Sequence, residues 1–301
     1  DDALLVINSG RYEFRNKGID LFIDALGRLN RKKGSHKEII AFITVPAHHT
    51  GASKQLQELL NTGKKAVPGD DHYLTHELYD AGDDPVINSL RQHKLHNRAG
   101  DRVKVIFAPA YFDGNDGIFN MSYFDALAGF DVSVFPSFYE PWGYTPMESA
   151  AFSIPTVTTS LAGFGKWVDD HYKAEQKGVF VVERNDDNDE EVVAGITDYL
   201  WDFYQMADGQ RKQARKEAFD VSMITLWENL LDNYRDAYSF ALEQASKRVG
   251  EYFNKKRSHE YFLKDISKEF KPVWKTIFIK PVISEKLKKL TELAGNLWWS
   301  W

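Results

Sequence analysis

Short, continuous apolar runs recur along the chain, separated by polar loops and by segments with helical periodicity. A run of about four to eight apolar residues is typical of a strand that is buried on both faces of a sheet. Strands that alternate with helices predict an α/β fold with a Rossmann-like, doubly wound parallel sheet. The predicted strands are Ala3 to Ile7, Ile39 to Val45, Val103 to Ala108, Val132 to Phe135, Thr156 to Thr159 and Gly178 to Glu183.

Helical patterns follow several of these runs. Apolar residues from Ile19 to Leu29 recur at helical spacing, and a helix is expected to begin at Ser53. The polar residues 61–102 read as an insertion on the sheet, with short helices around Tyr73 to Tyr79 and Pro85 to Asn97. Further helices are predicted at Ser122 to Ala128, from Pro146 to about Ser153, and at Val192 to Met206. His48 and His49 lack metal-ligand spacing and are expected to be loop residues.

The chain is expected to divide near residue 250. Residues 1–250 carry the alternating pattern and form the predicted ligand-binding domain, with extra charged helices after about Glu190. Residues 251–301 are predicted to be a linker and the start of a following domain. That segment contains a short predicted strand at Thr276 to Ile279 and an amphipathic helix at Ser284 to Leu293.

The composition argues against several classes of function. The net charge of −6 does not suggest a nucleic-acid or membrane partner. The chain has no cysteine, which excludes disulfides and thiolate metal sites and fits a reducing, cytoplasmic compartment. No apolar run approaches the roughly 18 residues of a membrane span. The start, Asp1 to Ile7, lacks the basic region of a signal peptide.

The segment Phe135 to Glu148 reads as strand end, loop and helix start. Thr145 is the predicted N-cap, Pro146 suits the first helical position, and Glu148 would complete a capping box. A loop of this kind lies at the carboxyl end of a strand, where open α/β sheets bind ligands.

Several residues of this loop are candidates for ligand contact. Backbone amides of Gly143, Tyr144 and Thr145 at the helix start suit a phosphate, and Trp142 lies beside them. Glu140 can contact a sugar hydroxyl or stabilise a positive sugar carbon. The alternative for Glu140 is an ordinary exposed acid.

Other candidates have equally plain alternatives. Arg11, Arg15 and Lys17 follow the first strand and can neutralise a diphosphate, or form a solvated basic loop. Tyr123 can stack on a base or belong to the core. Glu148 can bind ribose hydroxyls or only cap its helix.

Three segments together resemble the donor-binding half of glycogen synthases of the animal and fungal type. They are Gly10 to Gly18, Phe135 to Glu148 and Thr158 to Gly165, and the resemblance extends over roughly residues 1 to 245. The Glu140-to-Glu148 motif alone is shared by many retaining glycosyltransferases of the GT-B fold. The arginine–lysine loop makes the combination specific. The tail, Leu287 to Trp301, is similar to the start of bacterial α-glucan phosphorylases.

The resemblance implies roles for these residues. Arg11 and Lys17 match the pair that holds the donor diphosphate, and Glu140 matches the glutamate beside the transferred glucose. Glu148 matches the ribose-binding acid, and Tyr123 the base-stacking tyrosine. The turn that binds the diphosphate is matched by Gly143, Tyr144 and Thr145.

The resemblance also implies a reaction. The family transfers glucose from UDP-glucose, with retention and without a metal or cofactor, to the 4-hydroxyl of an α-1,4-glucan. The acceptor side belongs to an N-terminal domain that this sequence lacks, so we expect the fragment alone to be inactive. The basic face of Arg211, Lys212, Arg215 and Lys216 is sparser than the family's effector cluster and is expected to be solvated. A homo-oligomer is compatible with the sequence.

Two other functions fit the same residues. The chain can be a non-catalytic scaffold that tethers a fused phosphorylase to glycogen, in which case it binds glucan without nucleotide. It can also be a sugar-nucleotide epimerase of the same fold, which would release a changed free sugar without any acceptor.

Overall fold

The computed structural model describes residues 3–34, 37–63, 71–172 and 178–249. Its main sheet has six strands in the order β5-β2-β1-β6-β7-β8, and every pair of neighbours is parallel. All six predicted strands are confirmed, with small shifts at their ends. They are β1 (Leu4–Ser9), β2 (Ile39–Thr44), β5 (Val103–Phe107), β6 (Val132–Val134), β7 (Thr156–Thr159) and β8 (Val179–Val182).

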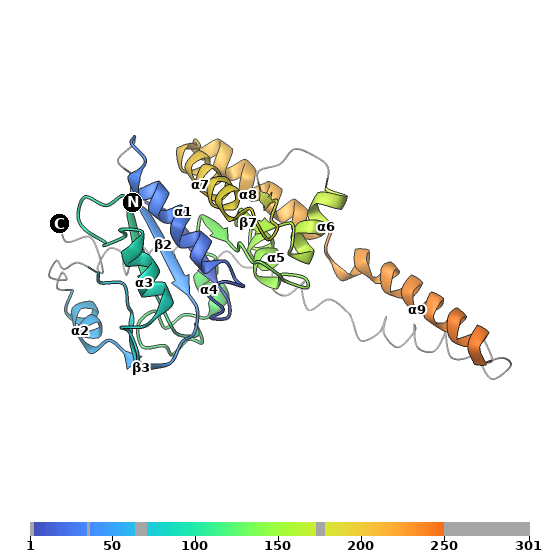
Figure 1. Cartoon of the computed structure of the whole chain (residues 1–301), viewed down its shortest axis with the longest axis horizontal. Coiled ribbons are helices and arrows are strands. Elements are labelled where there is room, and N and C mark those ends of the chain that lie inside the picture. Colours follow the sequence, from blue (N-terminus) through green and yellow to red (C-terminus); the bar gives the residue numbers. More distant parts are fainter. Residues whose placement is uncertain (1–2, 35–36, 64–70, 173–177, 250–301) are drawn as a thin grey trace. The chain divides into compact units, whose positions relative to one another are not determined.

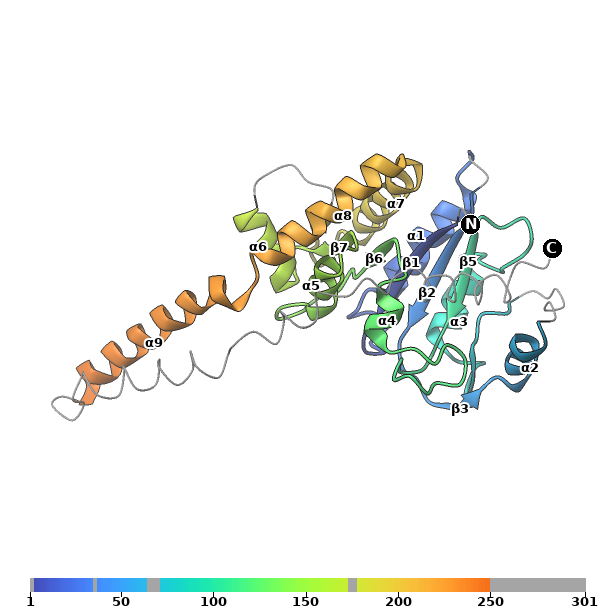
Figure 2. The ribbon, with the colours of Figure 1, turned by 180° about the vertical axis from the view of Figure 1, so that it is seen from behind.

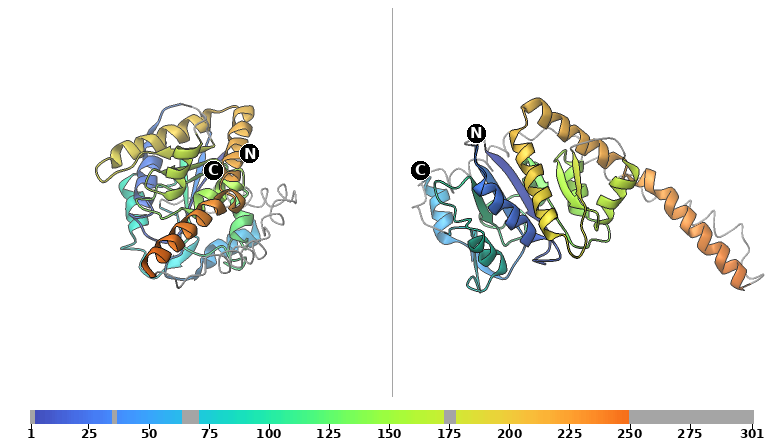
Figure 3. Two further views of the ribbon diagram at one scale, coloured as in Figure 1. Left: turned by 90° about the vertical axis from the view of Figure 1, so that its right-hand side faces the viewer. Right: turned by 45° about the horizontal axis from the view of Figure 1, so that its top comes forward.

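Helices cover both faces of this sheet, as predicted. Leu4 and Val6 of β1 belong to a core with α1 (Ile19–Arg31), α3 (Pro85–Gln92) and α7 (Asp189–Gln205), whereas Leu5 and Ile7 belong to the opposite core. Figure 1 shows α1 and α3 over one face, and Figure 2 shows α4 (Tyr123–Leu127) over the other. In the right panel of Figure 3, α7 lies beside α1.

A third core lies beside the β7–β8 end of the sheet. Val179 of β8 packs there with Phe164 and Ala218. The close fit is visible at Gly178, where an added Cβ would lie 2.1 Å from the backbone nitrogen of Ala218. The helices that contribute to this core are α5 (Tyr144–Ala151), α6 (Gly163–His171) and α8 (Asp208–Met223).

The strand order places a switch point next to β1. The chain proceeds from β1 to β2 and β5 on one side, and from β6 to β7 and β8 on the other. Because all pairings are parallel, the loops that follow β1 and β6 leave the same edge of the sheet side by side. Crevices at such switch points are where doubly wound sheets bind ligands.

The insertion differs from the prediction at its centre. Residues 73–79 are not helical: they contain β4 (His76–Leu78), which pairs antiparallel with β3 (His49–Ala52). The segment before β4 runs along the edge strand β5, where the amide of Phe107 donates to Tyr73 O at 2.8 Å. An uncovered edge strand leaves backbone groups unpaired, and this need for partners outweighs the local helical pattern. His49 therefore lies in a strand rather than a loop, its ring 4.8 Å from that of His76.

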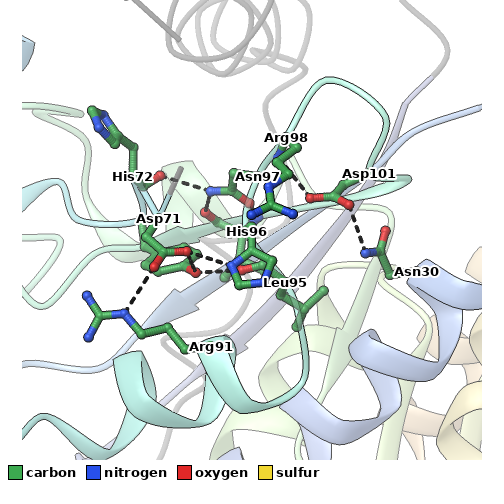
Figure 4. A network of polar contacts seen from close by, with 11 residues as sticks. Asn30, Asp71, His72, Arg91, Leu95, His96, Asn97, Arg98 and Asp101 are labelled. Carbon is green, nitrogen blue, oxygen red and sulfur yellow. Dashed lines mark hydrogen bonds and ion pairs between the residues drawn. The ribbon is translucent and has the colours of Figure 1, made fainter. Parts of the chain in front are cut away.

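A polar network orders the insertion, and Asn97 attaches it to the sheet (Figure 4). Asp71 accepts hydrogen bonds from Tyr73 at 2.7 Å and Arg91 at 3.1 Å, and pairs with His96 at 2.8 Å. Burial raises the pKa of Asp71, but these three partners outweigh burial and lower it below the ordinary value. Asn97 bonds both backbone groups of Val105 in β5, as an added strand residue would.

The remaining described helices are α2 (Lys54–Thr62), which begins after its N-cap Ser53, close to the predicted start, and α9 (Trp227–Val249). The described chain divides into two compact units at Met223, and α9 belongs to the second. No helix in the described ranges is long and apolar enough to cross a bilayer. The predicted elements at Thr276 to Ile279 and Ser284 to Leu293 lie outside the described residues.

Candidate functional site

The loops after β1 and β6 meet at the switch point. The amide of Phe138 donates to Asn16 O at 2.7 Å, so the two loops are joined through their backbones. Gly18 has φ +66°, and an added Cβ would lie 1.9 Å from Pro136 O. Only glycine allows this approach, which brings the predicted basic loop against the loop that carries the predicted acid.

Lys17 and Glu140 form an ion pair where these loops meet. Lys17 Nζ lies 2.6 Å from Glu140 Oε1 and 2.7 Å from Oε2, and the side chains are 13% and 20% exposed. Glu140 is fixed from the other side as well, because its carbonyl accepts a bond from the amide of Gly163 at 3.0 Å. Two residues 123 positions apart in sequence, each predicted as a site residue, are thus brought into contact.

The two arginines of the loop after β1 point elsewhere. Arg11 pairs with Glu13 at 2.8 Å, and its side chain is 72% exposed. Arg15 approaches Asp20 at 3.5 Å and is 85% exposed. Both partners belong to the same stretch of chain. Arg11 precedes Lys17 in the same loop, and its exposed guanidinium is accessible to a ligand.

The start of α5 differs from the predicted capping box. Gly143, with φ 100° and ψ 76°, is the N-cap, and no side chain caps the helix. Thr145 is already the second helical residue, so it cannot be the cap, and Pro146 is the third rather than the first. Glycine at the cap supplies no hydrogen-bond acceptor, so the first-turn amides of Tyr144 and Thr145 gain no side-chain partner there. The tight loop after Glu140 needs a residue with left-handed backbone angles just before the helix. Glycine adopts them without strain, so Gly143 rather than Thr145 becomes the N-cap.

Glu148 is consequently free of the capping role and faces Tyr123. Burial raises the pKa of Glu148 above its ordinary value. Burial raises the pKa of Tyr123 to about 12, with a further contribution from the Glu148 charge, although a bond to Ser9 opposes the rise. The hydroxyls of Tyr123 and Ser9 are 3.0 Å apart. Ser9, the last residue of β1, was not a predicted site residue; a polar side chain where an apolar run ends was its only signal.

Trp142 is packed against other aromatic side chains, whereas Tyr144 is exposed to solvent. The indole of Trp142 packs 6.1 Å from the Phe164 ring and 6.4 Å from Trp167, and its Nε1 donates to Met147 Sδ at 3.2 Å. These contacts give Trp142 a packing role, and ligand contact stays a prediction. Tyr144 is 65% exposed at the start of α5.

Arg184 contacts the backbone of the loop that leads to Glu140, although sequence reasoning did not select it. Its side chain is 3% exposed, donates to Pro136 O and lies 3.6 Å from Asp189. Its guanidinium also lies 5.1 Å from the Phe138 ring centroid. Arg184 therefore holds the segment that leads to Glu140. An arginine shortly after the apolar run of β8 was the available signal.

The basic face of α8 is engaged in structural contacts. Arg211 donates to Tyr204 O at 2.9 Å, and Arg215 pairs with Asp131 at 3.0 Å. Lys216 pairs with Asp220. The face is thus partly anchored to α7 and to the residue before β6, rather than wholly solvated as expected. Among the described residues, no group of three histidines, cysteines or carboxylates could hold a metal ion.

Comparison with known proteins identifies the family. The family model described as glycogen synthase matches residues 1–60 and 54–273. The glycogen [starch] synthase of Caenorhabditis elegans is 33% identical over 299 residues, covering 81% of this chain and 44% of the relative. Isoform 2 of Saccharomyces cerevisiae is 30% identical, covering 84% and 46%.

Among solved structures, a UDP-forming α,α-trehalose-phosphate synthase from Burkholderia xenovorans is 13% identical with a TM-score of 0.48, covering 81% of this chain and 45% of that one. The chain spans about half the length of the curated relatives it matches. Since the family model covers most of the sequence, the chain belongs to the glycogen synthase family.

Proposed function

We propose that the chain is the donor-binding half of a retaining glycosyltransferase that transfers glucose from UDP-glucose to an α-1,4-glucan. The observation that carries the proposal is the Lys17–Glu140 pair at the switch point, beside a helix start without a side-chain cap. Family membership supports the choice of donor and acceptor. The absence of cysteine supports a cytoplasmic setting.

The diphosphate would bind at the start of α5. Amides of Gly143, Tyr144 and Thr145 suit its oxygens, and the helix dipole favours the negative charge. Lys17 pairs with Glu140, so a phosphate at this helix start would compete with Glu140 for the ammonium group. Arg11 exchanges its exposed partner, Glu13, for the phosphate at little cost, because exposed ion pairs contribute little.

The transfer then depends on charge. The bond from glucose C1 to the diphosphate breaks, the acceptor oxygen bonds to C1 on the same face, and the acceptor proton leaves with UDP. Negative charge grows on the departing diphosphate, where Lys17 and Arg11 stabilise it. Glu140, released from Lys17, is then available to the hexose, whose C1 becomes positive.

The nucleoside end would lie toward β1. Glu148 is half-buried and accepts hydrogen bonds from ribose hydroxyls, which compensates the burial of its charge. Tyr123, held by Ser9, offers its ring to the base. A carboxylate that is costly to bury without a partner is typical of a ligand-binding position.

UDP should raise the thermal midpoint of the chain, because a ligand that binds only the folded state stabilises it. At ten times Kd the gain is about 1.4 kcal/mol. Arg11→Ala and Lys17→Ala should abolish the shift. Arg15→Ala is the matched control, since it removes a basic side chain from the same loop, whereas the resemblance assigns the diphosphate to Arg11 and Lys17 only.

The midpoint without UDP is measured for each variant, so that loss of binding is separated from loss of fold. No UDP-dependent shift at millimolar ligand, with the fold intact, would overturn the proposal. Glucan binding in that case would favour the glucan-tethering scaffold instead.

A further inference from the structure

Two histidine rings that the candidate donor site does not use meet inside the small sheet formed by β3 and β4. His76 of β4 is 1% exposed, and its ring lies 4.8 Å from that of His49 in β3, edge to face. A bulge produces this contact. β3 holds one residue more than β4 between their two paired positions, which are His49 with Leu78 and Ala52 with His76. An extra residue re-aims a side chain, and here it turns His49 to the face that carries His76.

Hydrogen bonds satisfy the neutral form of His76. The carbonyl oxygen of Asp116 can only accept, so Nε2 of His76 carries a proton and donates to it at 2.8 Å. In the neutral ring Nδ1 is then an acceptor, and the Thr75 hydroxyl donates to it at 2.8 Å. Both nitrogens are thus bonded without a charge. Within the described residues the buried Nδ1 of His49 has no hydrogen-bond partner, so a proton added there would lack an acceptor.

The bond from His76 joins the small sheet to the loop that leads into α4. Asp116 orders the start of this loop, because its carboxylate accepts from the amides of Ile118 and Phe119 at 2.9 and 2.7 Å. The loop ends at Tyr123, the first residue of α4. His76 therefore connects the insertion to the segment that positions Tyr123.

The surroundings of His76 oppose a positive charge. Burial lowers its pKa below the ordinary value, and a charge on His49 lowers it further, although the carbonyl bond and the charge of Asp116 act the other way. Glu77, the neighbour in β4, is exposed and lies on the opposite face of the strand. The closed arrangement therefore has its full stability above the ordinary histidine pKa of about 6.5, and loses it as the pH falls through the lower folded value.

We propose that the His49–His76 pair is a pH-sensitive latch, which holds the small sheet against the loop before α4 at neutral pH and releases it in mild acid. In the released state both rings reach water, where each can take up a proton without repelling the other. The latch does not depend on the proposed function. It gives the loop before Tyr123 a stability that varies with pH while the six-stranded sheet stays folded.

The test is hydrogen exchange of the full chain at pH 7.5 and 5.5, with each amide corrected for its intrinsic exchange rate. Three amides report on the latch: Thr75, which donates to Phe107 O, and Ile118 and Phe119, which donate to Asp116. Their protection should fall at pH 5.5, by as much as about tenfold for one histidine, because a released ring is then about ten parts protonated to one part neutral. The amides of β1 should keep their protection.

Three variants assign the effect to the pair. His76→Gln should remove the pH dependence, because its amide does not titrate but can still donate to Asp116 O. His49→Gln should reduce the pH dependence, since it removes the neighbouring charge that lowers the pKa of His76. His48→Gln is the matched control, because His48 adjoins His49 but is exposed, and the full pH dependence should remain.

Unchanged protection of the three reporting amides at pH 5.5 in the wild-type chain would overturn the proposal. An equal loss in β1 would do the same, since it would show global unfolding instead of a local release. A pH dependence that survives in His76→Gln, or disappears in His48→Gln, would also overturn it. The wild-type comparison decides the outcome even if His76→Gln does not fold, and His49→Gln, at a partly exposed position, supplies a second variant.

Discussion

Gly18 joins the two site loops at a point where no side chain fits. We expect Gly18→Ala to cost about 3 kcal/mol or more, since it combines backbone strain with a clash against Pro136. Gly63→Ala is the matched control: Gly63 has nearly the same φ, +62°, with nothing within 4 Å of an added Cβ, so strain alone should cost about 1 kcal/mol. Urea denaturation measures both, and equal losses would contradict a close contact between the loops.

Glu148 links stability to pH at the residue scale. Because burial raises its pKa, the folded state favours the protonated acid. The resulting stability is present below the unfolded pKa of about 4.3 and is lost as pH rises through the folded value. Glu148→Gln should therefore raise the thermal midpoint at pH 7, with the difference vanishing near pH 4.

The same variant should reduce the UDP-induced shift, because the amide donates where the ribose needs an acceptor. Glu190→Gln should instead lower the thermal midpoint at pH 7, since a hydrogen bond from Arg28 lowers the pKa of Glu190. A fall in the midpoint of Glu148→Gln at neutral pH would contradict the burial argument.

At the scale of elements, Asp84 does two tasks: it caps α3 and holds the loop after β1 through Tyr12. Asp84→Ala should cost about 2 kcal/mol, the sum of a lost cap and a lost hydrogen bond. Ser53→Ala is the comparison, because Ser53 only caps α2, and should cost about 1 kcal/mol. Asp84→Asn keeps an acceptor and should cost less than Asp84→Ala. Equal losses at Asp84 and Ser53 in chemical denaturation would show that the Tyr12 bond contributes nothing.

For the whole molecule, the unit that contains the sheet should fold without α9. The buried residues of the three described cores all precede Met223. A chain that ends at Met223 should therefore unfold cooperatively and keep its UDP-induced thermal shift. A chain that ends at Gln205 loses Ala214 and Ala218 from two cores and should be destabilised by several kcal/mol. Loss of cooperative unfolding in the longer form would show that the second unit is needed.

Much of this architecture could be predicted locally. A run such as Val132 to Phe135 becomes a buried strand because its own side chains are apolar, whatever lies beside it. Lys17 and Glu140 each follow such a strand. Parallel strands end at one edge of a sheet, so the sequence alone placed both residues on the ligand-binding edge.

Other features depended on neighbours far away in sequence. The switch point exists only because β1 lies between β2 and β6, and no local pattern specifies that order. Gly143 rather than Thr145 caps α5 because the loop must return tightly past Glu140. Residues 73–79 became extended because the edge of β5 needed hydrogen-bond partners. The spacing of apolar residues reflects contacts between positions a few residues apart. It therefore predicted the strands and helices, and the edge of the sheet at which the strands end. The partners of Ser9 and Arg184, over 100 and nearly 50 positions away, were decided by tertiary packing alone.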